Sequence, residues 1–191
     1  MPAASSRSVH DRLFIGLQYL LPQHFLSRLV WSLARTRINW LKRVLIRTFL
    51  RHYPVAISEA ERADPLAYDS FNDFFTRRLK QGARPIDDSP ASAVSPVDGY
   101  VSQAGALESG SLLQAKGINY SAGELLGGDP ALAAQFAGGA FATLYLAPHN
   151  YHRVHMPLAG TLRVARHVPG DLFSVNAATA EGVPGLFARN E

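Results

Sequence analysis

The chain has 191 residues, of which 47% are hydrophobic and 18% charged, so it can bury one globular core together with a smaller appendage. The absence of cysteine excludes disulfides, thiolate metal sites and a cysteine nucleophile. No long apolar run is free of charge and the N-terminus lacks the pattern of a signal peptide, so we expect neither a transmembrane helix nor secretion.

The net charge of +4 conceals an asymmetry along the chain. Residues 1–53 hold nine Lys or Arg and one acid, whereas residues 54–191 hold ten bases and fourteen acids. The chain therefore divides into a basic arm, residues 1–53, and a mildly acidic body, residues 54–191.

Apolar residues recur at helical spacing within the arm. They cover residues 13–21 and 25–33, and Pro22 sits where the first turn of a second helix tolerates proline. A third segment places apolar residues on one helical face and arginines on another: Ile38, Leu41, Leu45 and Phe49, against Arg43, Arg47 and Arg51. The pattern predicts basic amphipathic helices.

Two interpretations of these helices stay open. With Trp31 and Trp40, whose rings suit a headgroup layer, they fit a region that lies on an anionic membrane surface. Equally, they fit helices packed on the body with solvated arginines. No nucleic-acid-binding motif accompanies the basic charge, so we predict no nucleic-acid partner.

The body reads as α+β. Ser70 to Asp73 has the form of a capping box and predicts a short helix through Leu79, and residues 121–124 repeat that form. After Pro90, short β-type runs separated by Gly and Pro predict strands at residues 94–101, 112–115, 141–146 and 161–164.

Three histidines stand at i, i+3 and i+6 between two prolines: His149, His152 and His155. If residues 151–156 form a strand, His152 and His155 point to opposite sides and meet different partners. If they form a helical turn, the three imidazoles converge on one face, as a catalytic zinc site requires. Pro148 and Pro157 leave little room for a helix.

Asp98 is the best candidate to orient a histidine base, because it ends an apolar run at a predicted strand end. It is followed by Gly99, and on spacing alone the better interpretation of Asp-Gly is a turn in which the carboxylate accepts a backbone hydrogen bond.

Five blocks in order resemble the bacterial-type phosphatidylserine decarboxylase proenzyme, from about Phe71 to the last residue. They are residues 71–77 with 84–86, 95–99, 116–127, 151–157 and 169–176.

The resemblance implies a membrane-associated lyase of phospholipid biosynthesis, which converts phosphatidylserine to phosphatidylethanolamine. Its cofactor would be a pyruvoyl group that arises when a serine in a Leu-Gly-Ser-Thr motif cleaves the preceding peptide bond. The Asp and His that activate this serine map onto Asp98 and His155. The histidine implicated in decarboxylation, as an acid near the carbanion, maps onto His152.

The resemblance also implies a peripheral position on the cytoplasmic face of the cell membrane, an anionic phospholipid membrane and a small pyruvoyl subunit as partners, and it leaves a homodimer open. Residues 1–53 would be the membrane-associating region and residues 54–191 an incomplete catalytic, larger-subunit domain.

No Leu-Gly-Ser-Thr occurs in the sequence. We therefore expect a truncated larger subunit that by itself neither self-processes nor decarboxylates. Two alternatives stay open: a histidine-dependent metal hydrolase, and a non-catalytic fragment that binds membrane surfaces.

Overall fold

The computed structural model describes residues 8–115 and 118–190. The chain forms two compact units that are each discontinuous in sequence. Unit 1 comprises Met1–Arg28, Gln103–Thr143 and Ala165–Glu191, and unit 2 comprises Leu29–Ser102 and Leu144–Val164. The described residues form helices and two small two-stranded sheets, which confirms the predicted α+β class.

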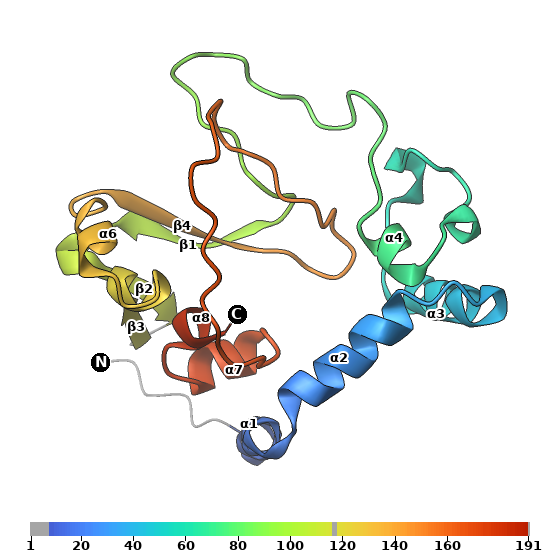
Figure 1. Ribbon diagram of the computed structural model, residues 1–191, viewed down its shortest axis with the longest axis horizontal. Helices are drawn as coiled ribbons and strands as arrows, with labels where there is room; N and C mark the ends of the chain where they lie inside the picture. The colour runs from blue at the N-terminus through green and yellow to red at the C-terminus, as the bar shows by residue number, and fades with distance from the viewer. Residues whose placement is uncertain (1–7, 116–117, 191) are drawn as a thin grey trace. The chain divides into compact units, whose positions relative to one another are not determined.

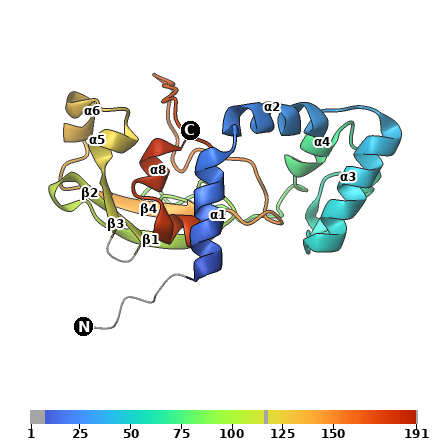
Figure 2. The same ribbon diagram turned by 90° about the horizontal axis from the view of Figure 1, so that it is seen from below.

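In unit 1, helix α1 (Val9–Leu20) packs against α7 (Ala177–Gly182). Ser8 begins α1, because its side chain accepts a hydrogen bond from the Asp11 N–H at 3.1 Å. Ile15 of α1 joins a buried cluster with Phe173, Val183 and Leu186, the last of which begins α8 (Leu186–Arg189). Figure 2 shows α1 and α8 in this unit.

A hairpin-like sheet forms the other core of unit 1. Strands β2 (Ser111–Ala115) and β3 (Ile118–Ser121) are antiparallel, with Leu112 opposite Tyr120. These two residues are buried with Leu107 and Ala122, where α5 (Ala122–Leu125) begins. The predicted capping box at Ser121 is confirmed, and a further short helix, α6 (Pro130–Ala134), follows.

Strands β1 (Tyr100–Ala106) and β4 (Ala140–Tyr145) pair in a second two-stranded sheet. The division between the two units falls within both strands. Single 3-10 turns occur at Ile57–Glu59, Pro65–Ala67 and Glu108–Gly110.

The helices predicted for the arm are present. Helix α2 (Gln23–Ala34) follows the break at Pro22, and all twelve of its residues are described with none buried. Helix α3 (Asn39–His52) lies in unit 2 next to α4 (Phe71–Phe75), as Figure 1 shows. Ile46 of α3 packs on Tyr68 and on Phe74 of α4. Among the described residues, none of the helices combines the length and apolar character needed to cross a bilayer.

Three local predictions are wrong. The strand predicted for residues 94–101 is present only from Tyr100, where β1 begins, so Asp98 lies in the loop before the strand. The helix predicted to reach Leu79 ends at Phe75, because the Thr76 hydroxyl donates to the Asn72 carbonyl at 2.8 Å and its backbone leaves the helical conformation. Residues 161–164 form no strand, and residues 151–156 are neither strand nor helix. The histidine segment is therefore a loop held by contacts with its neighbours.

Candidate functional site

A cleft of about 700 Å³ in unit 2 holds two of the three predicted catalytic residues. Asp98 and His155 line it, together with residues from segments 78–86, 94–98 and 151–156. Two backbone hydrogen bonds join the segments, from Val94 N–H to Pro157 O at 3.0 Å and from His155 N–H to Pro96 O at 2.8 Å. We call this the Asp98 cleft.

The carboxylate of Asp98 is held by Arg84. Arg84 Nε donates to Oδ1 at 2.8 Å and Nη2 donates to Oδ2 at 2.9 Å, a bidentate pair. Nη2 also donates to Glu59 Oε2 at 2.9 Å, so a single guanidinium bridges two carboxylates. The hydrogen bonds from Arg84 lower the pKa of Asp98, which keeps it ionised, and Asp98 in turn raises the pKa of Arg84.

Gly99 allows the chain to pass close to the end of β4. A Cβ at this position would lie 2.5 Å from the carbonyl oxygen of Tyr145. Since no side chain fits at that distance, the residue after Asp98 has to be glycine for the carboxylate to keep its place.

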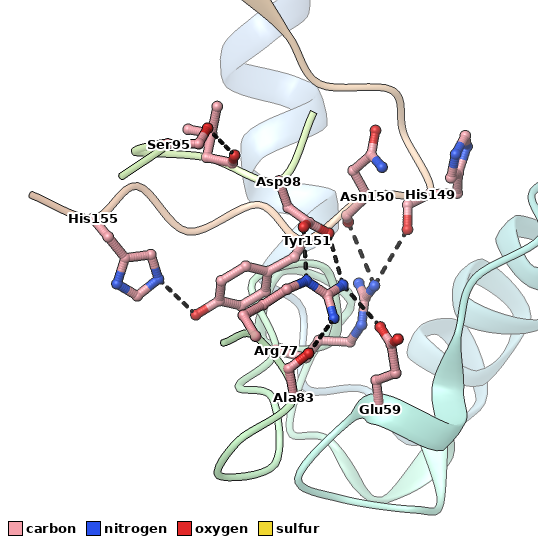
Figure 3. Close-up of polar contacts among 11 residues, drawn as sticks. Glu59, Arg77, Ala83, Ser95, Asp98, His149, Asn150, Tyr151 and His155 are labelled. Carbon is pink, nitrogen blue, oxygen red and sulfur yellow. Dashed lines mark hydrogen bonds and ion pairs between the residues drawn. The ribbon is translucent and has the colours of Figure 1, made fainter. Parts of the chain in front are cut away.

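Tyr151 connects the two predicted residues. Its hydroxyl lies 3.0 Å from His155 Nε2, and the two rings stack with centroids 5.5 Å apart. Its backbone N–H is among the groups that lower the pKa of Asp98. Figure 3 shows Tyr151 between Asp98 and His155, so the structure brings both residues to the same cleft but joins them through Tyr151.

His152 lies outside that cleft, in a different environment. Its ring stacks on Phe75 with centroids 4.1 Å apart, and Nε2 donates to the Ala147 carbonyl at 3.1 Å. Burial, followed by the charge of Arg77, lowers the pKa of His152 and favours the neutral ring. His152 and His155 thus meet different partners, although no strand positions them.

Residues 147–155 do not form the helical turn that would bring His149, His152 and His155 to one face for a metal ion. Across the described ranges 8–115 and 118–190, no three His, Asp or Glu side chains gather closely enough to hold a metal ion. His149 instead contributes its backbone carbonyl, which accepts a hydrogen bond from Arg77 at 3.3 Å. The histidine-dependent metal hydrolase is therefore not supported by this arrangement.

Sequence reasoning assigned no role to Arg84, Glu59 or Tyr151. A buried or half-buried carboxylate needs a cation, but the pattern does not say which of the 19 Lys and Arg residues supplies it. Tyr151 directly precedes His152 in the sequence. Its contact with His155, four residues later, could not be predicted, because residues 151–156 form a loop and a four-residue spacing brings side chains together only in a helix.

Comparison with known proteins gives two family matches. The model described as phosphatidylserine decarboxylase matches residues 71–191, and a model described as PSD matches residues 13–54.

Curated relatives agree with these matches. A phosphatidylserine decarboxylase proenzyme of Pseudomonas fluorescens is 60% identical over 180 residues, which cover 94% of this chain and 62% of the relative. Proteins of the same name from Ectopseudomonas mendocina and Azotobacter vinelandii are 60% and 58% identical, each over 95% of this chain and 63% of the relative. The chain thus spans about three fifths of the length of the curated relatives it matches.

Proposed function

The chain belongs to the phosphatidylserine decarboxylase family, and we propose that it forms the larger-subunit part of an enzyme that converts phosphatidylserine to phosphatidylethanolamine. The observation that carries this proposal is the Asp98 cleft. The aspartate and the histidine predicted to activate the serine both line it, and both lie within the residues that match the family. The alternative is a membrane-surface fragment with no catalytic role.

The cofactor proposed for this reaction is a pyruvoyl group made from a serine of the protein. The 191 residues contain no Leu-Gly-Ser-Thr segment from which it could arise, but the cleft presents an ionised carboxylate and an exposed imidazole to whatever segment enters it. When bound, the group supplies an electron sink for the loss of carbon dioxide. A small subunit that carries it is a proposed partner.

His155 would take the proton of the attacking serine hydroxyl. The His155 ring is exposed in the cleft, and the Tyr151 hydroxyl at Nε2 fixes its orientation. Arg84 keeps Asp98 ionised in the same cleft, where Tyr151 lies between the carboxylate and the imidazole. Asp98 and His155 would therefore activate the nucleophile together, with Tyr151 as the positioning residue between them.

His152 would act in the decarboxylation step. Its lowered pKa makes the protonated ring a stronger acid than an exposed histidine, which suits proton donation to a carbanion. The stack on Phe75 and the hydrogen bond to Ala147 fix the ring, so its role does not depend on the Asp98 cleft.

The test uses the natural full-length gene product, or a chimera in which the residues after 191 come from the Pseudomonas fluorescens relative. Asp98→Asn and His155→Ala should block self-cleavage, seen as two subunits on a denaturing gel. His152→Gln should cleave normally but form phosphatidylethanolamine slowly. His10→Ala, an exposed histidine of α1, is the matched control.

Normal cleavage by the His155 variant would remove the proposed base. A wild-type protein that cleaves but does not convert phosphatidylserine would refute the proposed reaction itself.

We also propose that residues 1–53 attach the protein to the cytoplasmic face of the cell membrane through anionic phospholipid. The support is an unusual degree of apolar exposure: Phe25, Val30 and Trp31 of α2 are 66%, 62% and 59% exposed, and Trp40 of α3 is 66% exposed. The guanidinium of Arg35 lies 4.5 Å from the centre of the Trp31 ring. A cation next to an exposed aromatic ring suits a membrane surface, where the ring can enter the headgroup layer and the cation can bind anionic headgroups.

Liposome flotation tests this attachment. The protein should float with vesicles that contain anionic phospholipid, and Phe25→Ser with Trp31→Ser should abolish flotation without lowering the unfolding temperature, because both side chains are already exposed. Flotation that survives removal of residues 1–53 would contradict the proposal. The exposed apolar surface also supports the proposal of a homodimer, which light scattering of the same variants tests.

A further inference from the structure

A second cavity in unit 2, of about 360 Å³, is surrounded mainly by charged side chains. It is lined by four arginines and two carboxylates, with one tyrosine: Arg62, Arg77, Arg78 and Arg153, Glu61 and Asp73, and Tyr68. The guanidinium groups exceed the carboxylates by two, so the cavity attracts anions. We call it the arginine cavity.

Arg77 is buried in the wall of this cavity with much of its hydrogen-bonding capacity unused. Its side chain is 3% exposed, and Nη2 donates weakly to the carbonyls of His149 and Asn150, at 3.3 and 3.4 Å. Nε and Nη1 are buried and find no acceptor in the parts of the chain that the structure describes. A buried guanidinium is usually paired with an anion, since an unpaired buried charge is strongly destabilising.

Tyr68 presents a second buried polar group to the same cavity. Tyr68 is 3% exposed, and within residues 8–115 and 118–190 its hydroxyl donates to no acceptor. Burial raises the pKa of Tyr68, so the hydroxyl keeps its proton and can donate it. Three buried donor groups, Nε and Nη1 of Arg77 and the hydroxyl of Tyr68, therefore lack acceptors around one positively charged cavity.

The carboxylates of the cavity do not meet this need. Asp73 Oδ2 lies 3.8 Å from Arg62 and accepts a hydrogen bond from the Asp69 N–H at 3.1 Å. No ion pair between Asp73 and Arg77 occurs among the described side chains. Arg78 is exposed, at the rim of the cavity.

We infer that the arginine cavity binds the phosphodiester group of the phospholipid on which the enzyme acts, an inference that rests on the proposed function. Guanidinium groups match the geometry and charge of phosphate oxygens, and several donors can bind one tetrahedral anion at once.

The cavity lies on the same segments as His152. Arg77 binds the carbonyls of His149 and Asn150, and Arg153 Nε donates to the Thr76 carbonyl at 2.7 Å. The chain that carries the histidine proposed for decarboxylation is thus fixed to the chain that carries the phosphate site. A lipid held by its phosphate in the cavity would therefore be held by the same two segments that position that histidine.

Direct binding tests the site without any need for catalysis. In the natural full-length gene product, sn-glycero-3-phosphoserine should raise the unfolding temperature in a saturable way. Arg78→Gln should weaken its binding about tenfold, since a charged hydrogen bond is lost, and Tyr68→Phe should weaken it about threefold to tenfold. Arg163→Gln, the same change at an exposed arginine outside the cavity, should leave binding unaltered.

Kinetics with a soluble short-chain phosphatidylserine give a second measurement. Arg78→Gln and Tyr68→Phe should raise KM by the same factors. In Tyr68→Phe, whose side chain lines the arginine cavity but not the Asp98 cleft, kcat and the extent of self-cleavage should stay within twofold of the wild type. Both substitutions spare the buried Arg77, so the protein should remain folded.

The outcomes separate the two proposals. Unchanged binding of glycerophosphoserine by both variants would overturn the phosphate site even if the protein is an active decarboxylase. If both variants bind glycerophosphoserine more weakly but the wild type has no decarboxylase activity, the phosphate site is supported and the proposed reaction is refuted. Inorganic phosphate that binds as tightly as glycerophosphoserine would overturn the assignment to a lipid.

Discussion

Replacing Arg84 with glutamine should destabilise unit 2 by releasing Asp98. The substitution removes the bidentate pair with Asp98, at 2.8 and 2.9 Å, and the bond to Glu59 at 2.9 Å. It also removes a charged donor from the Ala83 carbonyl, at 2.7 Å.

The expected loss is moderate because these groups are partly solvated. The Arg84 and Glu59 side chains are both 39% exposed, and that of Asp98 is 27% exposed. Fully exposed pairs contribute about 0–1 kcal/mol, and the bidentate geometry places this one at the upper end or above it. We expect the free energy of unfolding to fall by about 1–2 kcal/mol at pH 7.

The pH dependence identifies the source of the loss. Arg84 holds the pKa of folded Asp98 below its unfolded value of about 3.9, so its contribution is complete above about pH 5. The contribution disappears as the pH falls through the lowered pKa of the folded state. The difference in denaturant midpoint between wild type and Arg84→Gln should therefore be constant from about pH 5 to 8 and shrink below about pH 4.

Urea unfolding of the full-length protein at these pH values measures the effect, with Arg163→Gln as the control for loss of an exposed arginine. A difference that persists unchanged at pH 3, or a control variant that loses as much stability, would refute the argument, because neither follows from a pair with Asp98.

Three further predictions concern single residues. Gly99→Ala should lower the free energy of unfolding by about 1–3 kcal/mol in urea titrations and slow self-cleavage, because its Cβ would meet the Tyr145 carbonyl at 2.5 Å. Gln114→Ala should lower it by about 2–3 kcal/mol, since the buried carbonyls of Ala180 and Val183 lose donors at 2.8 and 2.9 Å. In an NMR titration the ring of His152 should change protonation below pH 6.5, and an equal or higher value would contradict its burial.

The helices were predictable where periodicity and capping agree. The arm's spacing gave α1, α2 and α3, and Ser121 with Glu124 gave the start of α5. Two starts carry equally good signals that were missed: Asp129 before Pro130 begins α6, and Asn176 with Thr179 forms a capping box that begins α7.

The strands were less predictable, because a strand needs a partner that its own sequence does not specify. Residues 161–164 have the composition of a strand, yet Leu162 and Val164 are exposed and, in the described part of the chain, no neighbouring strand pairs with them. Strand β3 was not predicted, although its Tyr120 is buried against Leu112.

The candidate site illustrates the same limit at the level of side chains. Residue type and resemblance indicated Asp98, His152 and His155. Two of their partners, Arg84 and Phe75, come from segments that only the fold brings near, whereas Tyr151 contacts His155 from within the same loop. The partners decide the chemistry. Arg84 lowers the pKa of Asp98, and the apolar contact of His152 with Phe75 lowers the pKa of that ring by burial.

Tyr151 has the most specific consequence for how the site works. Its backbone contact with Asp98 does not depend on its side chain, whereas its hydroxyl is the group that contacts His155. Tyr151→Phe should therefore leave Asp98 in place and free only the imidazole. If self-cleavage in this variant slows about tenfold while the unfolding temperature is unchanged, the hydroxyl positions His155. A variant that cleaves as fast as the wild type would show that stacking and the His155 to Pro96 backbone bond are sufficient.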